Sequence, residues 1–302
     1  MTPSAHLPRR RFLATTGIAA VVNLLQGQLR AADDAAGATS GKVRHSVCKW
    51  CYPKIPLEDL AAAAKEIGLE SIELLDPPDF AILKKHDLHC AMVSFPTAQM
   101  PDGTKIGVIP KAFNRIEHHD LLVSVYEPLL KASAEAGFKQ VICFSGNRDG
   151  LDEEQGLKNC AIGLKRLLPL CEKLGVTLCM ELLNSKVNHP DYMCDHSAWG
   201  VALCEELGSE HFKLLYDIYH MQIMEGDVIA TIRKHHPHFA HYHTGGVPGR
   251  HEIDETQELN YPAIVRAIQD TGYKGYLGQE FQPARPDQLA SLKQAVGICS
   301  VG

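Results

Sequence analysis

The sequence lacks several features whose absence argues against whole classes of protein. Its 302 residues include 30 Lys and Arg against 36 Asp and Glu, a formal net charge of -6, so it has no basic excess to follow a phosphate backbone. No GxGxxG motif follows the first apolar run, as a dinucleotide-binding sheet would require. No second pair of cysteines or histidines accompanies Cys48 and Cys51 at zinc-finger spacing. These absences argue against a nucleic-acid partner, a doubly wound sheet and a structural zinc site.

The N-terminus also lacks an apolar run of the length that spans a membrane. Residues 9–13, RRRFL, lead into a weakly apolar stretch that ends near Leu25 and is interrupted by Thr15, Thr16 and Asn23. This arrangement resembles a twin-arginine export signal, and a membrane anchor is the alternative. We expect residues 1–41 to be a removed or flexible leader, with no stable membrane span after processing. We also expect export, to the periplasm, by the twin-arginine route.

The ten cysteines are spread along the chain, mostly inside apolar runs. An exported protein with this many cysteines usually carries disulfides. Cysteines inside strands and helices, however, commonly act as small buried apolar side chains. The twin-arginine route exports proteins that are already folded, often with a cofactor in place, and reduced cysteines suit that history. We therefore expect the cysteines to be reduced and buried.

Short apolar runs alternate with segments of helical period from residue 43 onward, without a low-complexity linker. Units of helix, glycine and apolar strand, as in AGFKQVICF and LGVTLCMEL, are typical of parallel βαβ structure. One long helix is predicted over residues 155–175. The pattern predicts a single α/β domain over residues 42–302, a (β/α)8 TIM barrel, with a doubly wound sheet as the alternative. The eight predicted strands span residues 45–50, 71–75, 89–94, 140–144, 176–182, 213–217, 239–243 and 275–280.

Side chains that can bind a metal end four consecutive predicted strands: Glu181, Asp217, His243 and Glu280. They lie 36, 26 and 37 residues apart, so a barrel would bring them together at the carboxyl ends of neighbouring strands, where barrel active sites lie. A single acid after a strand is more often a helix cap or an ion-pair partner, but caps would not recur in four successive units. Three carboxylates and one imidazole suit Mn²⁺ or Mg²⁺ best, with Zn²⁺ or Co²⁺ as further options.

Several segments resemble the hydroxypyruvate isomerase family, within the xylose isomerase-like barrels that include the ketose 3-epimerases. They are MELLNSKVNHPDY, LLYDIYHMQIMEGDVI, VPGRHEID, ELNYPAIVRAI and GYKGYLGQEFQP. The resemblance implies that Glu181, Asp217, His243 and Glu280 hold one divalent metal ion, and that Glu181 and Glu280 are also the catalytic acid–base pair. The isomerases usually have glutamine where this chain has His243, whereas the related epimerases have histidine. That difference leaves the identity of the substrate open.

The chemistry implied by the resemblance is the interconversion of a small 2-hydroxy aldehyde and a hydroxy ketone, such as tartronate semialdehyde and hydroxypyruvate. A proton moves between neighbouring carbons through an enediolate, whose charge the metal stabilises. His220, one turn beyond Asp217, would bind a substrate oxygen, and Arg250 would bind a substrate carboxylate. A helix-start histidine and a surface-loop arginine are the alternatives. Trp50 is interpreted either as a wall of the pocket or as a core residue.

Other polar residues have plainer interpretations. Lys186 and His189 follow the fifth predicted strand, and we expect them in a solvated loop at the rim. His118 and His119 open a predicted helix, and we expect them to be solvated.

Other functions compete with the isomerase. A ketose 3-epimerase or an isomerase of a sugar derivative is the nearest alternative. The abasic-site endonucleases share the barrel and use three zinc ions, but they need further ligands on the second to fourth strands and a basic groove. Here the third and fourth strands run out at Ser94 and Ser145. A non-catalytic exported sugar-binding protein is a third option. The expected partner is a small hydroxy-keto acid or sugar, and self-association stays open.

Overall fold

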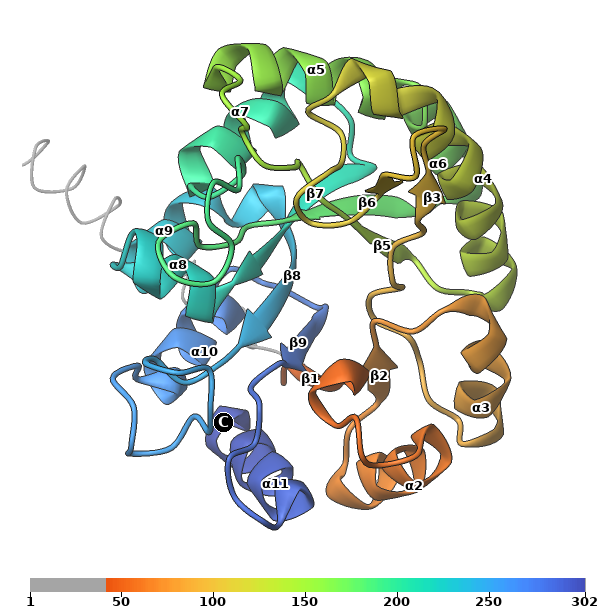
Figure 1. Ribbon diagram of the computed structural model, residues 1–302. Coiled ribbons are helices and arrows are strands. Elements are labelled where there is room, and N and C mark those ends of the chain that lie inside the picture. The colour runs from red at the N-terminus through yellow and green to blue at the C-terminus, as the bar shows by residue number, and fades with distance from the viewer. Residues whose placement is uncertain (1–41, 302) are drawn as a thin grey trace, which may run out of the picture. The chain divides into compact units, whose positions relative to one another are not determined.

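A curved sheet of seven parallel strands forms the centre of the fold. The computed structural model of the protein describes residues 42–301, so the predicted leader lies outside the described residues. The strand order is β2-β1-β9-β8-β7-β6-β5. Figure 1 shows these strands around a common centre with the helices outside them. The strands are β1 Arg44–Cys48, β2 Ser71–Glu73, β5 Gln140–Cys143, β6 Thr177–Glu181, β7 Phe212–Asp217, β8 Phe239–Thr244 and β9 Tyr276–Gln279.

The ring is closed by the segment that we predicted as the third strand, residues 89–94. It forms isolated bridges rather than a strand, pairing with Ser71 of β2, with Leu75 just beyond β2 and with Val141 of β5. The hydroxyl oxygen of Ser71 accepts the backbone N–H of Ala91 at 2.8 Å, which takes that N–H out of a regular ladder. The barrel fold is confirmed, with seven strands and one irregular segment at its eight positions among residues 42–301.

Helices cover the outside of the sheet: α2 Leu57–Ile67, α3 Phe80–Lys85, α4 His119–Ala136, α5 Glu153–Lys165, α6 Leu168–Leu174, α7 Ser197–Leu207, α8 Ile218–Met224, α9 Val228–His235, α10 Tyr261–Asp270 and α11 Gln288–Cys299. Short 3-10 turns lie at Lys49–Cys51, Pro77–Asp79, Ile116–His118 and His236–His238. Gly137 and Gly175 end α4 and α6 with φ of 85° and 62°, a backbone region that favours glycine, before the next strand begins. The predicted units of helix, glycine and strand are therefore present.

Two helices differ from the prediction. Residues 155–175 form α5 and α6 instead of one helix, because Pro169 lies in the first turn of α6 and has no N–H to continue the helical bonding. Helix α8 was not predicted, and it begins directly after β7. The side chain of Asp217 caps it by accepting the backbone N–H of His220 at 3.0 Å. Asp217 at the end of the apolar strand β7 therefore has a structural role as the cap of α8.

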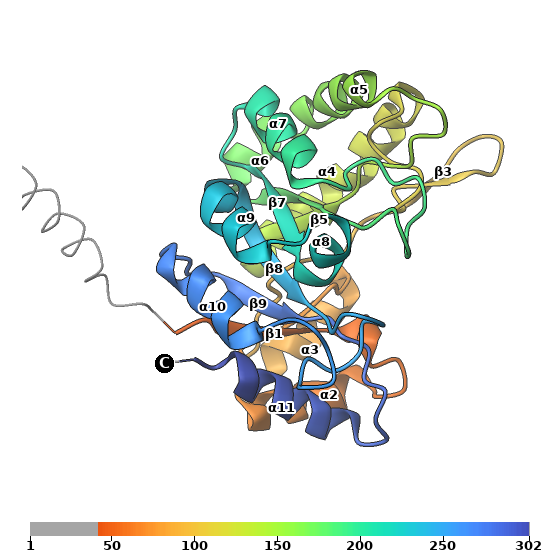
Figure 2. The same cartoon turned by 90° about the vertical axis from the view of Figure 1, so that its left-hand side faces the viewer.

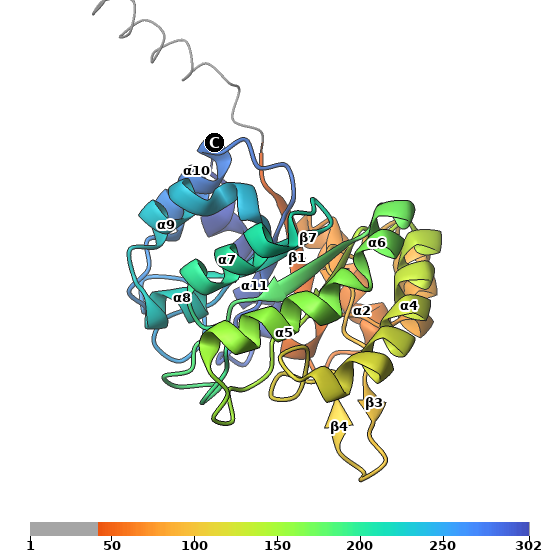
Figure 3. The same cartoon turned by 90° about the horizontal axis from the view of Figure 1, so that it is seen from above.

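The loop after residue 94 projects from the barrel and carries a two-stranded hairpin. Its strands are β3 Ala98–Gln99 and β4 Lys105–Ile106, paired antiparallel. The hairpin stands out from the ring in Figure 2 and Figure 3. The same loop supplies Phe95 and Ile109 to the wall of a cavity at the barrel mouth.

The burial of the cysteines agrees with the prediction, and that of two histidines does not. All ten cysteines are free and buried. His118 and His119 are also buried, so the prediction that they are solvated is wrong. A ring nitrogen of each lies within hydrogen-bonding distance of a carbonyl in the preceding loop, at 3.0 Å from Ala112 and 2.9 Å from Phe113. Within residues 42–301 no helix has both the length and the apolar character to cross a membrane.

Candidate active site

The four predicted strand-end residues meet at one end of the barrel. Glu181 ends β6, Asp217 ends β7, His243 is the penultimate residue of β8, and Glu280 follows β9. Each offers one ligand atom, and these atoms all lie within 4.8 Å of one another. All four side chains are buried. Parallel pairing places Asp217 opposite His243, which explains why residues so far apart in the sequence converge. We call this group the acid cluster.

Asp217 divides its two oxygens between structure and site. Oδ1 caps α8, whereas Oδ2 lies 3.1 Å from Nη2 of Arg250 and faces the acid cluster. Burial raises the pKa of Asp217 to about 8, although Arg250 acts in the opposite direction. A carboxyl group with so high a pKa is costly to keep ionised unless a cation accompanies it.

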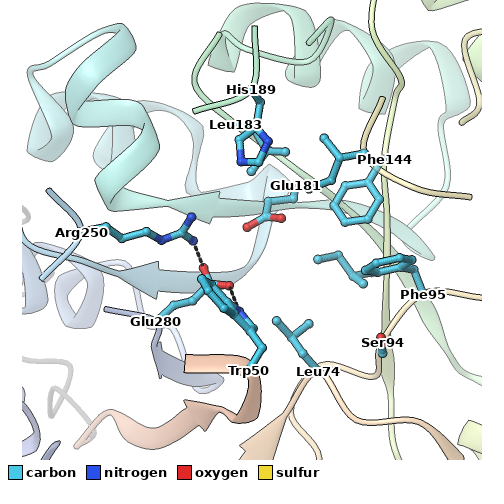
Figure 4. A pocket seen from close by; sticks show the side chains of 12 residues that line it. Trp50, Leu74, Ser94, Phe95, Phe144, Glu181, Leu183, His189, Arg250 and Glu280 are labelled. Carbon is cyan, nitrogen blue, oxygen red and sulfur yellow. Dashed lines mark hydrogen bonds and ion pairs between the residues drawn. The ribbon is translucent and has the colours of Figure 1, made fainter. Parts of the chain in front are cut away.

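Arg250 is the cation that accompanies these acids. Its Nη2 lies 2.5 Å from Oε2 of Glu280 as well as 3.1 Å from Asp217, and the guanidinium is buried. The residue has φ of 60°, an unusual conformation for a non-glycine residue. Figure 4 shows the side chain reaching across the site to Glu280. Arg250 therefore contacts metal-competent acids directly and is not a surface-loop arginine.

The two glutamates have pKa values that are shifted in opposite directions. Burial and the neighbouring charge of Glu280 raise the pKa of Glu181. Burial also acts to raise the pKa of Glu280, but His243 and Arg250 outweigh it and lower that pKa well below its usual range. Oε1 of Glu280 in addition accepts the indole N–H of Trp50 at 2.8 Å. A pair of carboxyl groups with separated pKa values is suited to act as a proton donor and a proton acceptor.

The donor set fits a divalent cation. Oε1 of Glu181 and Nδ1 of His243 are buried and have no hydrogen-bond partner among the described residues. Nδ1 lies 2.7 Å from Oε2 of Glu280, so these atoms face each other across the acid cluster. In the ion-free protein, a proton on Nδ1 of His243 would relieve the repulsion between these two acceptor atoms. Glu280 accordingly raises the pKa of His243 against the effect of burial. Oxygen and imidazole donors of this kind suit Mg²⁺, Mn²⁺ and similar ions.

The predicted rim residues lie in different places. His220 is fully buried, and its Nδ1 lies 2.7 Å from the side-chain amide nitrogen of Asn184 while Nε2 lies 3.1 Å from Nη1 of Arg250. The structure thus places His220 behind Arg250, and its contact with substrate stays a prediction. Lys186 donates to backbone carbonyls at the end of α8, at 2.9 and 3.1 Å. His189 instead lines the cavity, with its ring 5.3 Å from that of His220.

A cavity of about 440 Å³ opens beside Glu181 and Glu280. Seven of its twelve lining side chains are apolar, and Figure 4 shows Leu74, Phe95 and Phe144 across the site from Arg250. Trp50 lines it with 42% of its surface exposed, so of its two predicted interpretations the pocket wall is correct. The lining residues are Trp50, Leu74, Ser94, Phe95, Ile109, Ile142, Phe144, Glu181, Leu183, His189, Arg250 and Glu280.

Glu73 is a buried residue of this region that the sequence interpretation missed. It ends β2, is fully buried, and has Oε1 at 2.6 Å from Nε2 of His243 and 2.9 Å from Nε2 of His241. The available signals were an acid inside the apolar run SIELL and two histidines spaced by two in FAHYHT. Residues i and i+2 of a strand face the same side, so both histidines point into the barrel.

Comparison with known proteins agrees with this geometry. The sequence profile of the family described as xylose isomerase-like TIM barrel matches residues 61–296. A Homo sapiens protein named putative hydroxypyruvate isomerase is 28% identical over 244 residues, which cover 80% of each chain. A 2-oxo-tetronate isomerase of Cupriavidus necator is 38% identical over 109 residues, 36% of this chain and 41% of that one. A solved structure described as AP endonuclease, family 2, from Brucella melitensis has a TM-score of 0.75 at 25% identity, covering 84% of this chain and 98% of the other.

The profile match spans most of the barrel and includes all four residues of the acid cluster. The two relatives found by sequence carry the names of isomerases. The chain therefore belongs to the xylose isomerase-like TIM barrel family, is similar to the hydroxypyruvate isomerases within it, and is an enzyme of the isomerase type.

Proposed function

We propose that the protein is a divalent-metal-dependent isomerase that interconverts a small 2-hydroxy aldehyde and a hydroxy ketone, of the tartronate semialdehyde and hydroxypyruvate type, through an enediolate. The observation that carries the proposal is the acid cluster itself, in which two glutamates with oppositely shifted pKa values border a cavity. An isomerisation of this kind needs one group to remove a proton and one to return it to the neighbouring carbon.

Each residue of the site has a role in this proposal. Glu181, Asp217, His243 and Glu280 would hold the ion, which supplies electrophilic stabilisation of the negative charge that develops on adjacent substrate oxygens. Glu280 has the lower pKa and is suited to take the proton, and Glu181 is suited to return it. Trp50 fixes one oxygen of Glu280 through its indole N–H, which leaves the other oxygen directed at the acid cluster.

A ketose 3-epimerase is the second candidate, and the charge and the wall of the cavity favour it. Arg250 is the single cationic side chain lining the cavity that the described residues form, and it already contacts Asp217 and Glu280. The three carboxylates of the acid cluster balance one arginine and one divalent ion, so no positive charge is left over for a substrate carboxylate. The apolar wall likewise suits an uncharged sugar carbon chain better than a small keto acid.

Deuterium exchange tests both candidates. The full chain loaded with Mn²⁺ is incubated in D₂O with hydroxypyruvate and, separately, with a panel of ketoses, and deuterium on carbon is measured by mass spectrometry. We expect incorporation into at least one compound, and the preferred compound distinguishes the isomerase from the epimerase. Glu181→Gln and Glu280→Gln should abolish incorporation.

The matched control for these variants is Glu252→Gln. Glu252 is also buried, but it accepts hydrogen bonds from Ser291 and from the backbone of Ala284 and Arg285, outside the acid cluster. Its variant should keep the exchange activity. Binding of a sugar without any exchange would replace the proposal with the non-catalytic sugar-binding protein.

The endonuclease alternative has little in the structure to support it. Beyond the acid cluster, the described residues form one other metal-competent group, Cys48, Glu73 and His243, and it shares His243 with the acid cluster. Ser94 lines the cavity and offers no metal-binding side chain of the kind that a zinc cluster needs. The net charge of -6 also disfavours DNA.

We further propose that the protein is exported by the twin-arginine route. The support is the sequence RRRFL at residues 9–13 and the weakly apolar stretch after it. A fusion of residues 1–41 to a reporter should reach the periplasm of a bacterial host, and Arg10→Lys with Arg11→Lys should retain it in the cytoplasm. Equal distribution of both fusions would exclude this route.

A further inference from the structure

Glu73 has a polar environment that the proposed proton transfer does not use. Its Oε1 lies 2.6 Å from Nε2 of His243, 2.9 Å from Nε2 of His241 and 3.4 Å from Sγ of Cys48. All four side chains are buried in the barrel interior. A carboxylate is costly to bury, so a position like this one requires the compensation that these donors give.

The contact with Glu73 determines which nitrogen of His243 faces the acid cluster. A neutral imidazole carries a proton on one nitrogen, and a carboxylate can only accept. A histidine that binds a metal ion is neutral, so in the ion-bound protein His243 would donate Nε2–H to Glu73 and keep a lone pair on Nδ1. Nδ1 is the nitrogen that lies 3.5 Å from Oε1 of Glu181 and 2.7 Å from Oε2 of Glu280.

We propose that Glu73 is a positioning residue that holds His243 in the Nε2–H tautomer and directs Nδ1 to the metal. This inference rests on the metal dependence in the proposed function. His241 supports the arrangement by donating to the same oxygen, with its ring at 86° to that of His243 and 5.0 Å away. Carboxylates that accept the second N–H of a metal-bound histidine fix the ring orientation and raise the basicity of the ligand nitrogen.

Gly278 on β9 supplies the space for this contact. A Cβ added at position 278 would overlap Oε1 of Glu73 and lie 2.7 Å from Cδ2 of His243. Neither neighbour can move freely, because both are buried and hydrogen-bonded to each other. A glycine here is what allows the carboxylate and the imidazole to meet beneath the acid cluster.

A competing assignment is a second cation held by Cys48, Glu73 and His243, whose ligand atoms also lie within 4.8 Å of one another. That site would use Nε2 of His243 as a ligand and leave no proton on that nitrogen to donate to Glu73. The two assignments therefore differ in the tautomer of His243 and in the number of ions bound.

The test measures ion binding and tautomer, not turnover. Calorimetric titration of the chelator-treated full chain with Mn²⁺ gives the affinity and stoichiometry, and NMR of the Mg²⁺-loaded, ¹⁵N-histidine-labelled chain identifies the protonated nitrogen of His243. We expect one ion per chain and a proton on Nε2. Glu73→Ala should weaken Mn²⁺ binding by about 10- to 100-fold, the range found for such supporting groups. Gly278→Ala should weaken it as well.

Glu73→Gln should restore part of the affinity, because its amide oxygen still accepts the Nε2 proton. Glu252→Ala is the control, since it removes a buried glutamate that lies outside the acid cluster and should leave Mn²⁺ affinity unchanged. If Glu73→Ala fails to fold, the tautomer of His243, measured by NMR in Glu73→Gln and in the wild type, tests the inference instead.

Three results would overturn the inference: an unchanged Mn²⁺ affinity in the Glu73 variants, a proton on Nδ1 of His243, or two ions per chain. A wild type that binds Mn²⁺ with Nε2 protonated but exchanges no deuterium with any substrate would support the role of Glu73 and refute the proposed isomerase. A wild type that binds no divalent ion would refute the role of Glu73 together with the metal dependence.

Discussion

Replacing Arg250 by glutamine should destabilise the ion-free protein and enlarge its response to Mn²⁺. In the structure, Nη2 of Arg250 forms an ion pair with Oε2 of Glu280 and contacts Oδ2 of Asp217, and all three groups are buried. Removing one partner of a buried ion pair costs about 3–5 kcal/mol. For a domain of this size, each kcal/mol shifts Tm by about 2–4 °C, so Tm should fall by about 6–20 °C.

Mn²⁺ should reverse much of this loss in the variant. A cation that binds Asp217 and Glu280 competes with the guanidinium in the wild type, and the variant lacks that competitor. At a fixed Mn²⁺ concentration the tighter binder gains more stability by mass action. Differential scanning calorimetry after chelation, with and without Mn²⁺, therefore should give the larger rise in Tm for Arg250→Gln.

Arg148→Gln is the control for this experiment. Arg148 is a partly buried arginine whose Nη2 lies 3.0 Å from Oδ1 of Asp195, and it contacts no member of the acid cluster. Its variant should lose stability without any change in the rise caused by Mn²⁺. The reasoning about Arg250 is refuted if Mn²⁺ stabilises the wild type more than Arg250→Gln, or if the ion-free variant melts with the wild type.

Three further predictions concern the ion-free fold. The pKa of Asp217, about 8, lies above its value of about 3.9 in unfolded chains, so the folded state holds the proton more tightly. The free energy of unfolding therefore falls as the pH rises from about 4 to about 8, by at most about 1.4 kcal/mol per pH unit. Asp217→Asn removes this term, so urea unfolding should show its stability relative to the wild type increasing across that range; a constant difference would contradict the shift. Tyr192 accepts the N–H of Ser145 at 3.1 Å and donates to the carbonyl of Glu181 at 3.0 Å. Tyr192→Phe should cost about 1–3 kcal/mol in urea unfolding, because two buried backbone groups lose their partner, and an unshifted midpoint would argue against both bonds. Because all ten cysteines are buried and free, a thiol reagent should label none of them quickly in the native protein and all ten in denaturant; rapid native labelling would contradict their burial.

The convergence of the acid cluster was predictable because its residues interrupt or end apolar runs of the sequence. Glu181 and Asp217 end buried strands and Glu280 directly follows one, and the barrel places the carboxyl ends of parallel strands together. The regular spacing of the units then carries most of the information about the fold. Where the spacing is regular, local pattern and tertiary structure agree.

The positions of Arg250 and Glu73 in the site could not be predicted from local sequence patterns. Arg250 reaches the acid cluster because its loop folds back with φ of 60°, and no local pattern in VPGRHE specifies that path. Glu73 lies inside an apolar run, and its partners His241 and His243 are on a strand far away in the sequence. The prediction that His118 and His119 are solvated was wrong for the same reason, since their partners are loop carbonyls that only the tertiary structure brings near.

The pairing of β1 with β9 has a consequence for folding during synthesis of the chain. The last strand of the ring lies between β1 and β8, and Glu280 follows it directly. A nascent chain that has not yet released residues 276–280 from the ribosome therefore has an open ring and an incomplete acid cluster. The complete ligand set that we propose is therefore available only after residue 280 has left the ribosome, and a truncated product that lacks β9 and Glu280 has an incomplete acid cluster even if its other strands pair.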